Sequence, residues 1–239
     1  MKQTIKILQL YPRDMNIYGD WGNALVLQRR AQWHGYNVEL LEYNPGDTFP
    51  ADIDIVVGGG GQDSGQQIIK DDLQKLKPQL QKLADDNVPM LVVCGLYQLF
   101  GHKFTLHSGD IIKGIGVLDI ETIGGSERMI GNIHTYSEEF GDIVGYENHS
   151  GATIIGESTD ALAKVIIGAG NNLSEGHEGA QYKNVIGTYL HGSLLPKNPN
   201  IADWLIEKAC VRTFGEFNGN VIDDSFADQA RATTLQRPR

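Results

Sequence analysis

The chain has 239 residues, and 20 Lys and Arg against 30 Asp and Glu give a formal net charge of −10. This length can bury a sizeable core, and 41% hydrophobic with 21% charged residues is globular composition, which argues against disorder. The acidic balance argues against nucleic acid as a partner, because phosphate backbones select clusters of Lys and Arg.

The sequence also bears on membrane insertion, secretion and disulfide formation. No apolar run approaches the roughly 20 residues that span a bilayer, and the N-terminal residues lack a signal-peptide pattern. Cys94 and Cys210 are too few for a disulfide framework and suit a reducing compartment. We therefore expect a soluble, cytoplasmic protein with no transmembrane segment.

The first hundred residues alternate short apolar runs with helical patterns. The predicted strands are 4–10, 36–43, 54–57 and 89–93, and the predicted helices are 22–34 and 63–83. Pro78 should split or kink the second helix. Strands that alternate with helical crossovers form parallel sheets. We predict an α/β fold with a doubly wound, mostly parallel open sheet flanked by helices, whose ligand site lies at the carboxyl ends of the strands.

The second half of the chain has a different pattern of apolar residues and glycines. Between residues 109 and 186, short β-like runs separated by glycines predict an irregular, partly antiparallel region. A strand over 184–190 and a closing helix over 201–211 follow. We expect a single domain over 1–222 and a polar C-terminal tail over 223–239, which is either mobile or docked on a partner.

Cys94 stands where an apolar strand meets a helix. It follows the run 89–93 and precedes Gly95, after which LYQLF can begin a helix. Such an elbow exposes a nucleophile, the helix N-terminus stabilises a thiolate, and the amide of Gly95 would face an oxyanion. The alternative is a buried core cysteine.

His191 ends the strand NVIGTYL and so stands at a strand terminus of its own. If this strand neighbours that of Cys94, the imidazole can act as general base and then as acid. The other six histidines lie in loops, helices or glycine-rich turns without such a context. No pair has metal-ligand spacing, so we predict no metal site.

Four consecutive glycines, 58–61, follow the strand over 54–57. No GK[ST] follows them, so they do not form a phosphate-binding loop. Glycines allow positive φ and close backbone approach, so this loop could donate a second oxyanion N–H beside Gly95. A merely flexible connection is the other interpretation.

These segments together match a known pattern. The chain resembles the class I (triad-type) glutamine amidotransferases, in the cobyric acid synthase-like branch, from the first strand to about Arg212. The segments that carry the resemblance are GGGGQD (58–63), VCGLYQLFG (93–101), GYENHSGAT (145–153), TYLHG (188–192) and LLPKNP (194–199).

The resemblance implies roles for individual residues. Cys94 would attack the side-chain amide of glutamine, and His191 would activate it and protonate the departing ammonia. Arg128, in SERMIGN, would hold the substrate, since a guanidinium can clamp an α-carboxylate; its spacing alone indicates a solvated surface residue. Gly60 and Gly95 would be the oxyanion donors.

The chain departs from the family pattern at two positions. Leu96 replaces the second glycine after the nucleophile, which puts the shape of the pocket in question. Ser193 stands two residues after the histidine, where most triad-type members carry an acid. We therefore expect a Cys–His dyad, or a histidine oriented by a group from elsewhere.

The segments ENHSG and YLHGSLLPKNP are most similar to free-standing glutaminase subunits of cell-wall synthesis. This implies a heterodimer in which a Mur-ligase-like partner binds ATP and Mg²⁺ and amidates the D-glutamate α-carboxylate of lipid II to D-isoglutamine. No cofactor is expected on this chain, and lipid II would be reached only through the partner.

Three alternatives remain from the sequence. A glutaminase for cobyric acid-type amidation would call for a large synthetase domain in the same chain. A catalytically silent, partner-binding subunit would have no chemical need for Cys94 and His191. A γ-glutamyl peptidase would prefer γ-glutamyl peptides to free glutamine.

Overall fold

The structure is a computed structural model that describes residues 3–237. Its first half contains β1 (Thr4–Leu10), α1 (Trp21–Trp33), β2 (Asn37–Tyr43), β3 (Ile55–Gly58), α2 (Asp63–Asp85), β4 (Met90–Val93) and α3 (Gly95–Phe100). The second half contains β5 (Lys103–Thr105), β6 (Ile111–Lys113), β7 (Ile120–Ser137), β8 (Gly141–Ile155), β9 (Ala163–Ile167), β10 (His177–Glu178), β11 (Ala180–Tyr182), β12 (Val185–Thr188), a 3₁₀ turn (Leu195–Lys197), α4 (Pro199–Phe214) and α5 (Ser225–Leu235).

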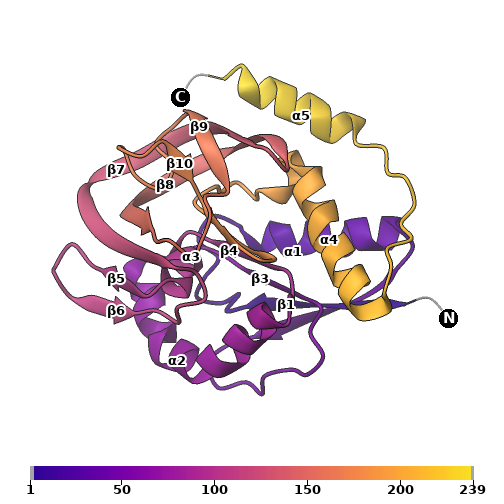
Figure 1. The fold of residues 1–239 in the computed structure, drawn as a ribbon, viewed down its shortest axis with the longest axis horizontal. Coiled ribbons are helices and arrows are strands. Elements are labelled where there is room, and N and C mark those ends of the chain that lie inside the picture. The colour runs from indigo at the N-terminus through magenta and orange to yellow at the C-terminus, as the bar shows by residue number, and fades with distance from the viewer. Residues whose placement is uncertain (1–2, 238–239) are drawn as a thin grey trace.

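A six-stranded sheet forms the centre of the molecule, in the order β11-β12-β4-β3-β1-β2. All neighbours are parallel except β11 and β12. Every residue of β3, β4 and β12 is buried, as expected for strands covered on both faces. In Figure 1, α1 and α4 lie on one side of this sheet and α2 on the other. The predicted doubly wound, mostly parallel α/β fold is confirmed.

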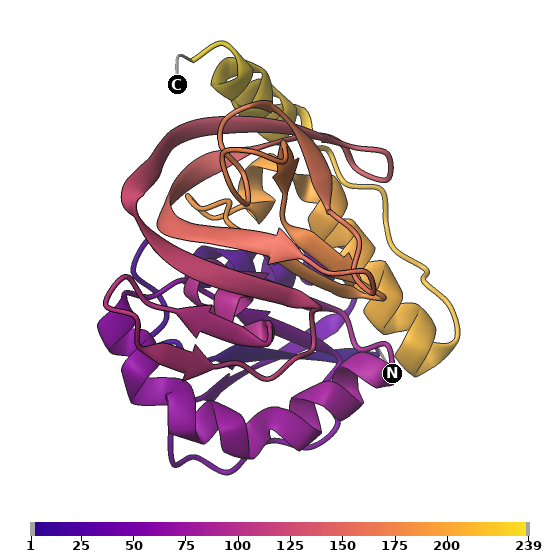
Figure 2. The same cartoon turned by 60° about the vertical axis from the view of Figure 1, so that its left-hand side comes forward.

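A second sheet has the order β10-β9-β7-β5-β6, with β8 paired to β7. Its pairs are antiparallel except β5 with β7, so the prediction of an irregular, partly antiparallel second half is also confirmed. The long β7–β8 hairpin curves over the central sheet (Figure 2). Its register shifts between Gly124 and Met129, and this irregular stretch contains Arg128.

Pro78 does not split α2, contrary to one of the two outcomes expected from the sequence. The helix runs from Asp63 to Asp85 with Pro78 inside it. Pro78 is exposed, whereas Leu73, Leu76 and Leu80 on the inner face are buried. The backbone bond that proline removes therefore lies on the solvent side, where water can satisfy the freed carbonyl of Gln74.

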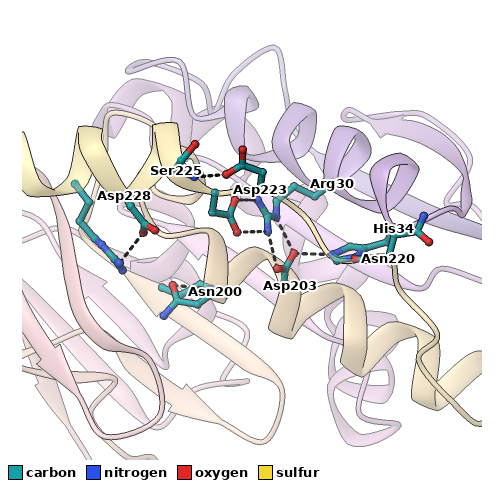
Figure 3. A network of polar contacts seen from close by, with 11 residues as sticks. Arg30, His34, Asn200, Asp203, Asn220, Asp223, Ser225 and Asp228 are labelled. Carbon is teal, nitrogen blue, oxygen red and sulfur yellow. Dashed lines mark hydrogen bonds and ion pairs between the residues drawn. The ribbon is translucent and has the colours of Figure 1, made fainter.

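The segment after α4 is tied down before it reaches α5. Arg30, only 4% exposed, donates to Asp203 of α4 and to Asp224 just before α5 (Figure 3). His34 bonds to Asp203 and to the carbonyl of Asn220. The expected tail over 223–239 is thus anchored at Asp224, and α5 follows with no buried residue. Residues 238–239 lie outside the described part of the chain.

Within residues 3–237, no helix is long and apolar enough to cross a membrane.

Candidate active site

Four adjacent strands of the central sheet have their carboxyl ends along the same edge of the sheet. In spatial order they are β12, β4, β3 and β1. Parallel strands present their carboxyl ends together, and this is where α/β sheets bind ligands. The segments that follow these strands carry His191, Cys94, the glycines 58–61 and Asp20. The topology therefore brings residues that lie up to 171 positions apart into one site.

Cys94 occupies a strained elbow between β4 and α3. Its φ of 49° and ψ of −104° are unusual for a residue with a side chain. The amide of Cys94 donates to Thr188 of β12 at 2.8 Å, and its carbonyl accepts from Gln98 of α3 at 3.0 Å. This geometry holds the thiol at the start of a helix, as the sequence predicted, and the side chain lines a cavity of about 400 Å³.

His191 and Cys94 both lie close to Gly60. A Cβ on Gly60 would come within 2.7 Å of Cε1 of His191 and 3.0 Å of Cβ of Cys94. Nε2 of His191 is buried and has no hydrogen-bond partner among the described residues. The close approach explains why a glycine stands at position 60, because any larger residue would separate the two side chains.

Asp20 supplies the acid that the sequence left unassigned. Nδ1 of His191 lies 3.1 and 3.2 Å from the two carboxylate oxygens of Asp20, whose side chain has no exposed surface. Asp20 stands immediately before α1, on the segment that follows β1. Ser193, at the position where the family pattern places an acid, instead donates to the carbonyl of Gly19 at 2.9 Å. The geometry is a Cys–His–Asp triad.

The surroundings favour a protonated His191. Burial by itself lowers the pKa of the imidazole, but the neighbouring Cys94 and the bond to Asp20 outweigh it and raise the pKa to about 10. An imidazolium between a carboxylate and a sulfur is the arrangement that stabilises a thiolate nucleophile.

The glycine loop differs from expectation at Gly60. Its amide donates to Oδ2 of Asp20 at 2.8 Å, and its carbonyl accepts from Ile17 at 3.1 Å. Gly60 therefore positions Asp20, and its N–H is not free for an oxyanion. In a trans peptide the next N–H points opposite to this carbonyl. The amide of Gly61 thus points away from Ile17, and its nitrogen lies 3.0 Å from where a Cβ of Gly95 would stand.

Arg128 reaches the same cavity from the second sheet. Its Nε donates to Oδ1 of Asn148 on β8 at 2.6 Å, and Nη2 donates to the hydroxyl of Tyr18 at 3.2 Å. The irregular register of β7 lets the side chain leave the strand here. The structure thus places the three predicted side chains, Cys94, His191 and Arg128, around one site.

Leu96 does not narrow the cavity. It is completely buried, and its Cδ1 lies 2.4 Å from where a Cβ of Gly58 would be. The side chain points into the core beneath the elbow, so its replacement of a glycine affects packing against β3 and leaves the cavity lining unchanged.

One further histidine, His149, lines the cavity, which the sequence did not indicate. Its ring stacks on Tyr189 with centroids 3.6 Å apart, and burial lowers its pKa to about 4.

Cys210 is buried in α4, and burial raises its pKa to about 11. In the part of the chain that the structure describes, no group of three or more His, Cys, Asp or Glu side chains could hold a metal ion.

Comparison with known proteins identifies the family of this chain. The family model of the CobB/CobQ-like glutamine amidotransferase domain matches residues 6–199. The chain belongs to this family. It is 40% identical over 225 residues to the lipid II isoglutaminyl synthase (glutamine-hydrolyzing) subunit GatD of Staphylococcus aureus, covering 93% of this amidotransferase and 91% of the relative. The subunit of the same name from Streptococcus pneumoniae is 37% identical, with 89% and 83% covered.

The solved structures support the fold. A crystal structure of a glutamine amidotransferase superimposes with a TM-score of 0.59 at 14% identity, covering 84% of this chain and 98% of the other. At this identity the likeness shows the shared α/β architecture alone.

Proposed function

We propose that this amidotransferase is a glutaminase subunit that hydrolyses L-glutamine through a Cys94 thioester and passes the ammonia to a separate synthase. The observation that carries the proposal is that Cys94 and the buried His191 both border Gly60, while Asp20 is bonded to Nδ1 of His191. The cavity beside it has the size for an amino acid, and Arg128 stands at its wall.

In the first half-reaction, the Cys94 thiolate attacks the side-chain carbonyl carbon of glutamine, and the carbonyl oxygen becomes an oxyanion. We assign the amides of Gly95 and Gly61 as donors to this oxyanion, since Gly95 follows the nucleophile and the nitrogen of Gly61 lies beside Gly95. His191 gives the proton of Nε2 to the amide nitrogen, and the C–N bond breaks to release ammonia and leave a thioester.

In the second half-reaction, the neutral His191 takes a proton from water, whose oxygen attacks the thioester carbon. The tetrahedral intermediate collapses to glutamate, and the sulfur leaves as the thiolate beside a protonated His191. Asp20 holds Nδ1 throughout, so the ring keeps Nε2 toward the sulfur in both halves.

Arg128 has donors left for substrate. A guanidinium carries five N–H groups, and Asn148 and Tyr18 accept one each. The remaining donors at the Nη end match the two oxygens of an α-carboxylate. We assign Arg128 to that carboxylate of glutamine.

The names of the relatives support a proposal for the acceptor. Two proteins that match most of this chain are named as the glutamine-hydrolysing subunit of lipid II isoglutaminyl synthase. We propose the same role here: ammonia goes to a Mur-ligase-like partner that binds ATP and Mg²⁺ and converts the D-glutamate α-carboxylate of lipid II to D-isoglutamine.

Intact mass after incubation with a diazoketone analogue of glutamine tests the glutaminase. We expect one adduct on the wild type and none on Cys94→Ala, for the chain alone or with its co-expressed synthase. No adduct in either state would indicate a silent binding subunit. Faster turnover of γ-glutamyl peptides than of glutamine would indicate a peptidase. Glutamine-dependent amidation of lipid II by the complex, lost in Cys94→Ala, tests the acceptor.

A further inference from the structure

The segment between β1 and α1 carries Tyr18 as well as Asp20. It is fixed to the active site at two points besides Asp20. The amide of Ile17 donates to the carbonyl of Gly60 at 3.1 Å, and Ser193 donates to the carbonyl of Gly19 at 2.9 Å. Tyr18 lies between these two attachments, so its backbone is placed relative to the glycine loop and to the segment of His191.

Tyr18 contacts two functional side chains at once. Its ring packs edge-on against the ring of His191, with centroids 4.6 Å apart and planes at 65°. Its hydroxyl accepts a hydrogen bond from Nη2 of Arg128 at 3.2 Å. Because the aromatic contact fixes the ring, the hydroxyl is presented at a defined point on the cavity wall.

Arg128 needs such a support. It is exposed on an irregular stretch of β7, and a long, exposed side chain has many rotamers to lose when it binds a ligand. Asn148 holds Nε from one side and Tyr18 holds Nη2 from the other. These two bonds fix the plane of the guanidinium and leave its outer edge free.

We infer that Tyr18 is a positioning residue for substrate selection: its hydroxyl aims Arg128 at the α-carboxylate of glutamine, while its ring rests on the catalytic histidine. The inference rests on the proposed glutaminase function and extends it, because it assigns part of the preference for a free α-carboxylate to a residue that does not itself bind it. Tyr18 thus connects the group that recognises substrate with the group that transfers protons.

Two electrophiles separate this role from a general structural one. The diazoketone analogue of glutamine carries an α-carboxylate, whereas iodoacetamide reacts with Cys94 without one. Tyr18→Phe keeps the ring and removes the hydroxyl. We expect the analogue to label this variant about five- to tenfold more slowly, the upper range for losing one ordinary hydrogen bond, because this bond is exposed and 3.2 Å long. Iodoacetamide should react within twofold of the wild-type rate.

Steady-state kinetics should show the same division. The KM for glutamine should rise about five- to tenfold in Tyr18→Phe, with kcat changed less than twofold. Tyr136→Phe is the matched control, because Tyr136 is an exposed tyrosine elsewhere on β7. It should match the wild type in every assay.

A double-mutant cycle ties the effect to Arg128. In an Arg128→Ala background, Tyr18→Phe should have no further effect on labelling by the analogue. Equal slowing with both electrophiles, an unchanged KM, or a full effect in the Arg128→Ala background would each overturn the inference about Tyr18. Absence of any labelling of the wild type by the analogue would instead overturn the proposed glutaminase function.

Discussion

Asp20→Asn tests the part of the active site that only the structure revealed. The side chain keeps its size, but an amide can donate to Nδ1 of His191, which would favour the tautomer with its proton on Nε2 and remove the charge that stabilises the imidazolium. The rise of the His191 pKa from 6.5 to about 10 corresponds to about 5 kcal/mol, which Asp20 shares with Cys94.

The share of Asp20 can be bounded. Hydrogen bonds to charged groups contribute about 1.5–3 kcal/mol, so kcat/KM should fall about 10- to 150-fold. The loss should depend on pH with a defined sign. Because the wild-type imidazolium persists up to about pH 10, removal of the carboxylate lowers the His191 pKa. The pH at which the rate declines on the alkaline side should therefore be lower by about one to two pH units.

The assay is release of glutamate from glutamine between pH 6 and 10.5. Asp71→Asn is the matched control, since Asp71 is exposed on α2 and the same charge is lost far from the site. A rate for Asp20→Asn within twofold of the wild type, with the alkaline limb in place, would show that Asp20 does not orient His191.

Three further predictions concern close packing and buried charge. Gly60→Ala should lower kcat by at least about 100-fold with an unchanged circular dichroism spectrum, because the new Cβ would separate His191 from the nucleophile. Burial raises the pKa of Glu178 from 4.5 to about 8, so the unfolded chain releases this proton between about pH 4.5 and 8 while the folded protein retains it, and stability falls over that range. Glu178→Gln should flatten this decline in urea unfolding, by at most about 5 kcal/mol. Arg30→Met should destabilise the fold by about 1.5–3 kcal/mol, measured the same way, because Asp203 and Asp224, both about one third exposed, lose the guanidinium while Asp203 keeps its bond to His34.

The fold, and the position of Cys94 and His191 at neighbouring strand ends, could be predicted from the sequence because local patterns encode them. Apolar runs followed by amphipathic helices give parallel strands, and Cys94 and His191 each follow such a run directly. A strand end is a local feature, and strand ends of one sheet share an edge. The sequence left open whether Pro78 splits α2 or only kinks it, because the outcome depends on which face of the helix meets solvent, and a single proline does not reveal that face.

Asp20 could not be predicted in the same way. It is one of 30 acidic residues, and it lies ten residues past the end of β1 on an irregular segment. Periodicity carries no information about where such a segment turns. The available signal was its position just before a helix at the carboxyl end of a strand, and that signal becomes decisive only once β1 is known to neighbour β3.

Strand order explains why the acid can come from so far away in the sequence. With β12, β4, β3 and β1 side by side, an imidazole after β12 faces the thiol after β4 and reaches across the glycine loop after β3 to a carboxylate after β1. Gly60 contributes to this arrangement in two ways. It has no Cβ to intrude on the space beside His191 and Cys94, and its amide donates a hydrogen bond to Oδ2 of Asp20. An acid two residues after the histidine is therefore dispensable here, and Ser193 is free to fasten the segment that carries Tyr18 and Asp20. The attachments that hold Asp20 beside His191 thus also place Tyr18, whose hydroxyl accepts a hydrogen bond from Arg128.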